Sequence, residues 1–174
     1  MPGIIAKRRK GMNHMLRKGK WMNRCIATVS VILWYAVIFG FSAQDGEESG
    51  SLSGAIAKAI MNVLGGDPEG EGCRTLETVI RKGAHMTEFA ILMLLLVWAL
   101  YAWTGVRNCK TLAAALCITV CLAALDEYHQ TFVEGRAGRS LDVLIDTSGA
   151  LLCACIIVLI AFLKKKRENH RQKV

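Results

Sequence analysis

The chain has 174 residues, of which 53% are hydrophobic, and its mean hydropathy is +0.34. This is more apolar than an ordinary soluble domain, whose apolar fraction is nearer half even with glycine counted. The net charge of +8 does not require a nucleic-acid partner, because anionic lipid attracts basic clusters that flank membrane spans. We therefore expect a membrane protein that binds no nucleic acid.

Four apolar blocks suggest helices that cross a membrane. A helix needs about 20 residues to cross hydrocarbon roughly 30 Å thick, and three of the blocks approach or reach that length. The third block is shorter and spans only if residues at both of its ends extend the helix. The blocks are Cys25 to Ser42, Ala84 to Trp103, Thr111 to Leu125 and Leu141 to Leu163. The predicted fold class is all-α, a polytopic membrane helical bundle with about four transmembrane helices.

The distribution of basic residues predicts an orientation. Most of the 22 lysines and arginines lie before the first block, between the second and third, or after the fourth. Basic residues near span ends are retained in the cytoplasm, so we expect a multi-pass protein with both termini cytoplasmic. The predicted organisation is a basic arm, flexible or lying on the surface, at residues 1–24, a four-helix membrane domain at 25–163 and a basic cytoplasmic tail at 164–174.

The connection between the first and second blocks has two parts. Asp45 to Ser53 is rich in turn residues and predicts a polar loop. From Ser53, the predicted N-cap, apolar residues recur at helical spacing. About 11 residues are too few to span, so we expect a short surface or re-entrant helix in this outer loop. The glycine-rich, acidic stretch from Gly65 to Gly72 ends that helix as a linker.

Ionisable residues gather at the same, outer end of the second, third and fourth spans. Arg81, His85 and Glu88 are spaced i, i+4, i+7 and share one helix face. Asp142, Asp146 and Gly149 repeat this spacing on the fourth helix. Charged groups at membrane depth tend to face protein or water and to find partners, so we expect one polar site. Its predicted ligand-binding residues are Arg81, His85, Glu88, Asp126, Glu127, His129, Gln130, Arg136, Arg139, Asp142 and Asp146.

Three ordered motifs resemble the VanZ-like family of bacterial membrane proteins. They are Arg-Lys-Gly-Ala-His-x-x-Glu-Phe from Arg81, Asp-Glu-x-His-Gln-x-Phe-Val-x-Gly-Arg from Asp126, and Asp-Val-x-Ile-Asp-Thr-x-Gly-Ala from Asp142. Ser42 and Gln44 resemble the serine–glutamine element of that family. The resemblance covers roughly residues 25–163. It implies a small protein of the bacterial inner membrane, linked to cell-envelope homeostasis and to resistance to glycopeptides such as teicoplanin.

The residues leave three interpretations of the polar site open. In the first, Arg81, Arg136 and Arg139 bind an anionic group of a membrane lipid or a lipid-linked envelope precursor, because guanidinium groups match phosphate and carboxylate geometry. In the second, the site is a hydrolase or transferase for a lipid phosphate or envelope precursor, with or without a metal. Its catalytic candidates are His85, Glu88, Asp126 and His129.

In the third interpretation, the polar groups only fix how the helices register against one another. The residues give no positive indication of a cofactor, and two histidines with several acids do not define a metal site; we expect neither. Four spans are few for a self-contained transporter, which leaves a homo-oligomer open.

Overall fold

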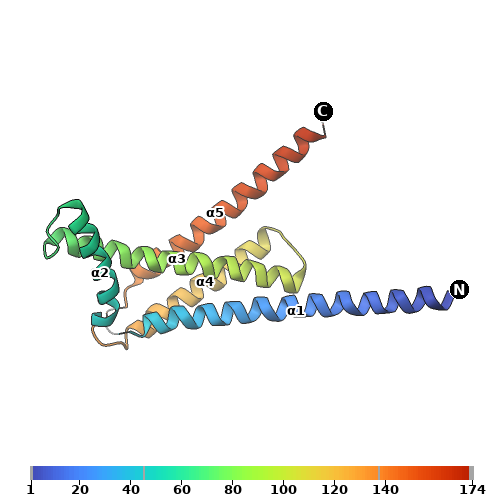
Figure 1. The fold of residues 1–174 in the computed structure, drawn as a ribbon, viewed down its shortest axis with the longest axis horizontal. Coiled ribbons are helices and arrows are strands. Elements are labelled where there is room, and N and C mark those ends of the chain that lie inside the picture. Colours follow the sequence, from blue (N-terminus) through green and yellow to red (C-terminus); the bar gives the residue numbers. More distant parts are fainter. Residues whose placement is uncertain (1, 45, 137, 173–174) are drawn as a thin grey trace.

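The residues that the structure describes form four long helices and one shorter helix, arranged as Figure 1 shows. The computed structural model describes residues 2–44, 46–136 and 138–172, and the side-chain environments of residues 17–44, 50–136 and 138–172. Within these ranges the chain contains no strand. The helices are α1 (Pro2–Ser42), α2 (Gly46–Leu64), α3 (Glu71–Thr104), α4 (Cys109–Gln130) and α5 (Ser140–Arg171). The predicted all-α bundle is confirmed.

All four long helices carry stretches that are long and apolar enough to cross a membrane. These stretches are Arg17–Ser42, Glu71–Thr104, Cys109–Gln130 and Ser140–Arg171. The third apolar block, Thr111 to Leu125, is too short to span by itself. The residues at its two ends extend the helix as predicted, from Cys109 to Gln130. The Asn108 side chain caps its start by accepting a hydrogen bond from the backbone N–H of Thr111 at 3.0 Å.

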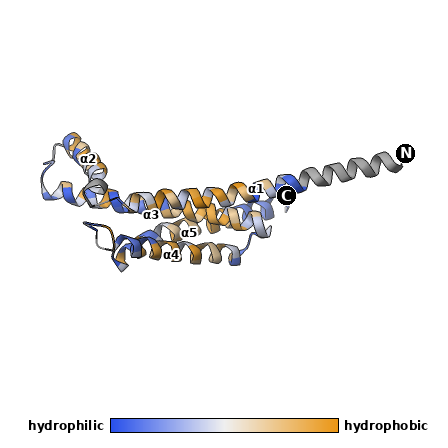
Figure 2. Ribbon diagram, turned by 90° about the horizontal axis from the view of Figure 1, so that it is seen from below, coloured by the Kyte–Doolittle hydropathy of each residue, from blue (hydrophilic) through white to orange (hydrophobic). Residues whose placement is uncertain are grey.

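Apolar residues occupy the middle of the bundle and polar residues its two ends (Figure 2). At one end α1 and α4 finish, α3 and α5 begin, and α2 lies alongside. We call this the α2 end. The opposite end carries the connection between α3 and α4 and the basic C-terminal turns of α5.

Helix α3 is central, since it packs against each of the other four helices. Its buried residues Phe89, Leu92 and Met93 form the core together with small residues of the neighbouring helices. The contact with α5 is tight, because a Cβ atom added at Gly149 would overlap the backbone carbonyl oxygen of Met86. The contact therefore depends on the absence of a side chain at Gly149.

Two details near the N-terminus differ from the predictions. The N-terminal arm is expected from the sequence to be flexible or to lie on the surface. In the structure it is helical, because α1 runs without a break from Pro2 to Ser42. Its many Lys, Arg and Met residues are good helix formers, which explains why the span helix continues into it.

The predicted polar loop and N-cap before α2 are also wrong, because α2 already begins at Gly46; Asp45 lies outside the described residues. Ser53 is inside the helix and donates to the backbone oxygen of Gly50 at 3.3 Å. With 19 residues, α2 is longer than expected because the turn-forming residues before Ser53 join it. Lys58 of α2 donates to Glu69 at 2.6 Å, and this hydrogen bond raises the pKa of Lys58.

Candidate functional site

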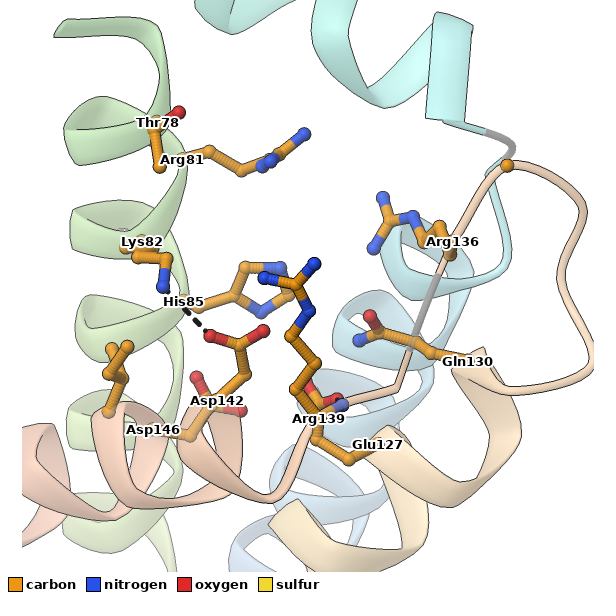
Figure 3. Close-up of a pocket in the computed structure, with 12 residues that line it drawn as sticks. Thr78, Arg81, Lys82, His85, Glu127, Gln130, Arg136, Arg139, Asp142 and Asp146 are labelled. Atoms are coloured by element: carbon orange, nitrogen blue, oxygen red, sulfur yellow. Dashed lines mark hydrogen bonds and ion pairs between the residues drawn. The ribbon is translucent and has the colours of Figure 1, made fainter. Parts of the chain in front are cut away.

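A cavity of about 400 Å³ lies at the α2 end, between α3, the end of α4, the α4–α5 connection and the start of α5 (Figure 3). Its lining contains most of the residues that the sequence analysis assigned to one polar site. The lining residues are Thr78, Arg81, Lys82, His85, Glu127, Gln130, Gly135, Arg136, Arg139, Asp142, Ile145 and Asp146. The fold thus brings residues more than 40 positions apart, such as Arg81 and Glu127, to one cavity.

Helix α3 supplies one wall and is tied to α5 by an ion pair. The Nζ of Lys82 lies 3.0 Å from Oδ1 of Asp142, and both side chains are partly exposed. Lys82 belongs to the first motif, but it is not among the ligand-binding residues that the sequence predicts. Its spacing of i, i+3 from His85 puts both residues on one helix face, and this spacing is the sequence signal for its place in the site.

The connection between α4 and α5 supplies the second wall. Glu127 accepts a hydrogen bond through Oε2 from the backbone N–H of Arg139, at 3.0 Å, directly before α5 begins. Gly138 packs so closely on α4 that an added Cβ would overlap the backbone oxygen of Glu127, and Gly135 has a φ of +73° that favours glycine. These features fix the short connection that carries Arg136 and Arg139.

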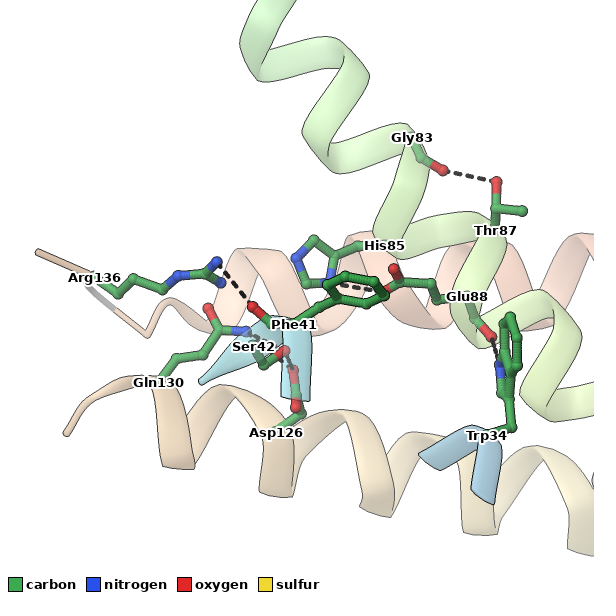
Figure 4. A network of polar contacts seen from close by, with 10 residues as sticks. All are labelled: Trp34, Phe41, Ser42, Gly83, His85, Thr87, Glu88, Asp126, Gln130 and Arg136. Carbon is green, nitrogen blue, oxygen red and sulfur yellow. Dashed lines mark hydrogen bonds and ion pairs between the residues drawn. The ribbon is translucent and has the colours of Figure 1, made fainter. Parts of the chain in front are cut away.

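A buried hydrogen-bond network lies behind the cavity and joins α1 to α4 (Figure 4). The Ser42 hydroxyl donates to Oδ2 of Asp126 at 2.6 Å, and Nε2 of Gln130 donates to the same oxygen at 3.0 Å. Ser42 and Asp126 are completely buried. Asp126 therefore supports the wall formed by Gln130 and does not itself line the cavity. In the sequence, only the resemblance to the VanZ-like family singles out Ser42.

Glu88 and His129 also lie outside the cavity lining. Oε2 of Glu88 is 3.7 Å from Nδ1 of His85, a contact too long for a hydrogen bond. The backbone oxygen of Glu88 accepts a hydrogen bond from Nε1 of Trp34 at 2.9 Å. The His129 ring packs on Phe39, with 4.1 Å between the ring centroids. Helix periodicity alone predicts that Glu88 and His129 belong to the site. In the structure, however, the sides of α3 and α4 that carry them turn partly toward α1.

The electrostatics of the cavity are mixed. The guanidinium groups of Arg81, Arg136 and Arg139 approach one region of it (Figure 3). Arg136 donates to the backbone oxygen of Phe41 at 3.3 Å, whereas the side chains of Arg81 and Arg139 make no hydrogen bond or ion pair within the described part of the chain. No group of three His, Cys, Asp or Glu side chains among the described residues is placed to hold a metal ion.

Four apolar helices of membrane length, with a charged cavity at one end of the bundle, define a polytopic helical membrane protein with a polar site. Residues 27–162 match the VanZ/LLP1 family. Because this match covers most of the chain, the protein belongs to the VanZ/LLP1 family. No curated protein and no solved structure gives a significant match to it.

Proposed function

We propose that the cavity at the α2 end binds an anionic group of a membrane lipid or of a lipid-linked envelope component. The observation that carries this proposal is the convergence of Arg81, Arg136 and Arg139 on one cavity, with two of the three guanidinium groups free of described partners. Guanidinium groups pair with phosphate and carboxylate through two parallel hydrogen bonds. An anion supplied by a ligand would offset the repulsion between the three cations.

The size and position of the cavity support a headgroup as the ligand. Its volume of about 400 Å³ is at the small end of the range for ligand pockets, roughly 300–1,000 Å³. It lies beside residues 78–85 of α3, at the start of the apolar block Ala84 to Trp103, and beside the first two turns of α5. A lipid could place its headgroup there while its chains stay in hydrocarbon.

The cellular setting of this proposal combines the family with the charge pattern. We infer that the protein resides in the bacterial inner membrane with both termini cytoplasmic, since basic residues flank the opposite end of the bundle. The cavity then faces the cell exterior. Binding an envelope component there would contribute to envelope homeostasis and to resistance to teicoplanin-type glycopeptides, the role that the family resemblance implies.

Replacing Arg81 or Arg139 by Gln tests the proposal. In nanodiscs that contain full-length protein, each variant should bind phosphatidic acid at least about ten-fold more weakly, because a charge-assisted hydrogen bond is lost. Arg74→Gln is the matched control, since Arg74 lies two turns earlier on α3, is exposed and does not line the cavity. Equal binding by all four proteins would refute the proposal. Susceptibility to teicoplanin of cells that express each variant tests the cellular role separately.

A second candidate function is catalysis on a lipid phosphate or envelope precursor. The observation that favours it is His85, which lines the cavity while its Nδ1 lies 3.7 Å from the Glu88 carboxylate. A carboxylate beside an imidazole can orient it as a general base. Turnover of a lipid phosphate by purified protein, abolished in His85→Ala and reduced in Glu88→Gln, would establish this function. Binding without turnover would leave the cavity as a binding site.

A further inference from the structure

An anion alone does not account for the composition of the cavity. Three carboxylates, those of Glu127, Asp142 and Asp146, line the same space as the three arginines. Carboxylates repel a ligand that carries only negative charge, unless each of them is neutralised by the protein. The partners of each carboxylate therefore decide what the cavity can accept.

Two of the three carboxylates have partners within the protein. Asp142 is paired with Lys82 at 3.0 Å. Glu127 accepts the backbone N–H of Arg139 at 3.0 Å. Both interactions also have a structural role, since the first joins α3 to α5 and the second holds the connection that precedes α5. These two acids need no ligand to explain their presence.

Asp146 is different. Its residue is only 2% exposed, and within the described part of the chain its carboxylate forms no ion pair or hydrogen bond, with Oδ2 fully buried. Leaving a buried carboxylate without a partner is strongly unfavourable, so such a group attracts a cation or a proton. Although Arg81 and Arg139 line the same cavity, neither makes an ion pair with it.

The view into the cavity shows how the charges are arranged. The guanidinium groups of Arg81 and Arg136 lie away from α5, and the carboxylates of Asp142 and Asp146 lie toward it; the Arg139 guanidinium lies between the two sets (Figure 3). A ligand that fills the cavity thus meets positive charge at one end and the unpartnered Asp146 at the other.

We propose that the ligand is a zwitterion, a phosphate or carboxylate that carries an amino group, with its anion held by Arg81, Arg136 and Arg139 and its ammonium group held by Asp146. This inference rests on the proposed function, because the arginines must hold the anion, and it deepens that function by naming the ligand class. An ammonium group supplies the cation that Asp146 lacks, and its three donors can also reach the neighbouring Asp142. An aminated lipid headgroup and a soluble amino phosphate share this chemistry.

A pair of lipids that differ only in the amine tests the inference. Full-length protein in nanodiscs is titrated with phosphatidylethanolamine and with phosphatidylethanol, which has the same phosphodiester but no amino group. We expect phosphatidylethanolamine to bind at least about ten-fold more tightly, as for other close charge pairs at interfaces. In Asp146→Asn this preference should disappear through weaker binding of phosphatidylethanolamine. Glu134→Gln, an exposed acid outside the cavity lining, should keep it.

Soluble probes distinguish a lipid from a free headgroup. Phosphoethanolamine and ethyl phosphate are added as competitors. Competition by the first and not by the second supports the inference and shows that the headgroup alone is recognised. A preference for the amine with the lipids and no competition by either soluble probe also supports it, with the membrane as the source of the ligand.

Failure of the inference and failure of the proposed function give different results. If the wild-type protein binds phosphatidylethanol as tightly as phosphatidylethanolamine, and Arg81→Gln weakens both, the anion site stands and the zwitterion is refuted. A preference that survives in Asp146→Asn refutes the role of Asp146. If Arg81→Gln affects neither lipid, the proposed function itself fails. The comparison of lipids on the wild-type protein remains decisive if Asp146→Asn does not fold.

Discussion

At the scale of single residues, buried hydrogen bonds fix the wall of the cavity next to α1. Asp126 has no exposed surface, and two donors from different helices, Ser42 and Gln130, share its Oδ2 atom. A buried carboxylate is tolerated when donors satisfy it and is costly when they are removed. The network therefore anchors the end of α1 to the end of α4, beside the cavity.

Ser42→Ala should lower the stability of the protein. The substitution removes one of the two donors to Asp126. We expect the free energy of unfolding to fall by about 1 kcal/mol. This value lies between the average contribution of a hydrogen bond between membrane helices and the cost of a buried acceptor without a donor. Thermal unfolding in detergent measures the effect. Ser148→Ala is the control, because that hydroxyl donates only to the Ile145 carbonyl of its own helix. Equal melting temperatures for the two variants would contradict the anchoring role of the network.

His129 should contribute to packing and not to ligand binding. Its ring lies against Phe39 with 4.1 Å between centroids, and aromatic pairs contribute about 0.5–1.5 kcal/mol beyond their burial. We expect His129→Ala to lower the melting temperature and His129→Phe to restore most of it, with phosphatidic acid binding unchanged in both. If His129→Phe folds with wild-type stability and loses lipid binding, the imidazole has a functional role that this contact does not explain.

At the scale of elements, the contact between α3 and α5 sets the geometry of the cavity. It places Lys82 against Asp142 and brings Arg81 and Asp146 to the same space. At Gly149 the two helices lie so close that an added Cβ meets the backbone of α3 at Met86. Backbone atoms cannot rotate away as the end of a flexible side chain can, so the helices themselves must separate.

Gly149→Ala and Gly83→Ala should therefore have opposite effects. We expect the first to destabilise the protein by about 1–3 kcal/mol through overpacking and to weaken lipid binding, because α5 carries Asp142 and Asp146. The second should stabilise it by about 0.5–1 kcal/mol, since Gly83 is helical, exposed and has no atom within 4 Å of an added Cβ. Thermal unfolding and lipid titration of both variants provide the measurement. A stabilising Gly149→Ala would be inconsistent with this helix contact.

At the scale of the whole molecule, the charged cavity and the basic clusters lie at opposite ends of the bundle. Basic residues flank the helices at the end away from α2, and acidic residues are concentrated near the α2 end. In the proposed orientation, in which basic residues are retained in the cytoplasm, the cavity would face the cell exterior, where envelope components are available. The proposed function depends on this orientation.

Labelling of single cysteines in intact cells tests the orientation. Glu134→Cys lies in the connection at the α2 end and Arg107→Cys in the connection at the opposite end, and both native residues are exposed. In a background in which all seven native cysteines are replaced by serine, a membrane-impermeant maleimide should label position 134 and spare position 107. Labelling of both positions after the cells are permeabilised is the control. The reverse pattern in intact cells would place the cavity in the cytoplasm.

The sequence by itself determined the number of long helices and the end of the bundle at which charge collects. Both are local properties, since helix length follows from uninterrupted apolar stretches and the polar faces follow from i, i+4 spacing within one helix. Arg81 with His85 and Asp142 with Asp146 were recognised in this way. The motifs also identified the family, because their order along the chain is itself a sequence property.

Only the tertiary structure decided which polar residues share a cavity. Helix periodicity shows which residues share a face of a helix, but not which neighbouring helix that face contacts. It therefore could not distinguish His85, which lines the cavity, from Glu88 and His129, which turn partly toward α1. It also could not show that Lys82 neutralises Asp142 while Asp146 has no partner among the described residues. These distinctions depend on how α3, α4 and α5 pack across more than 40 positions of sequence, and interactions between distant residues leave no periodic signal in one chain.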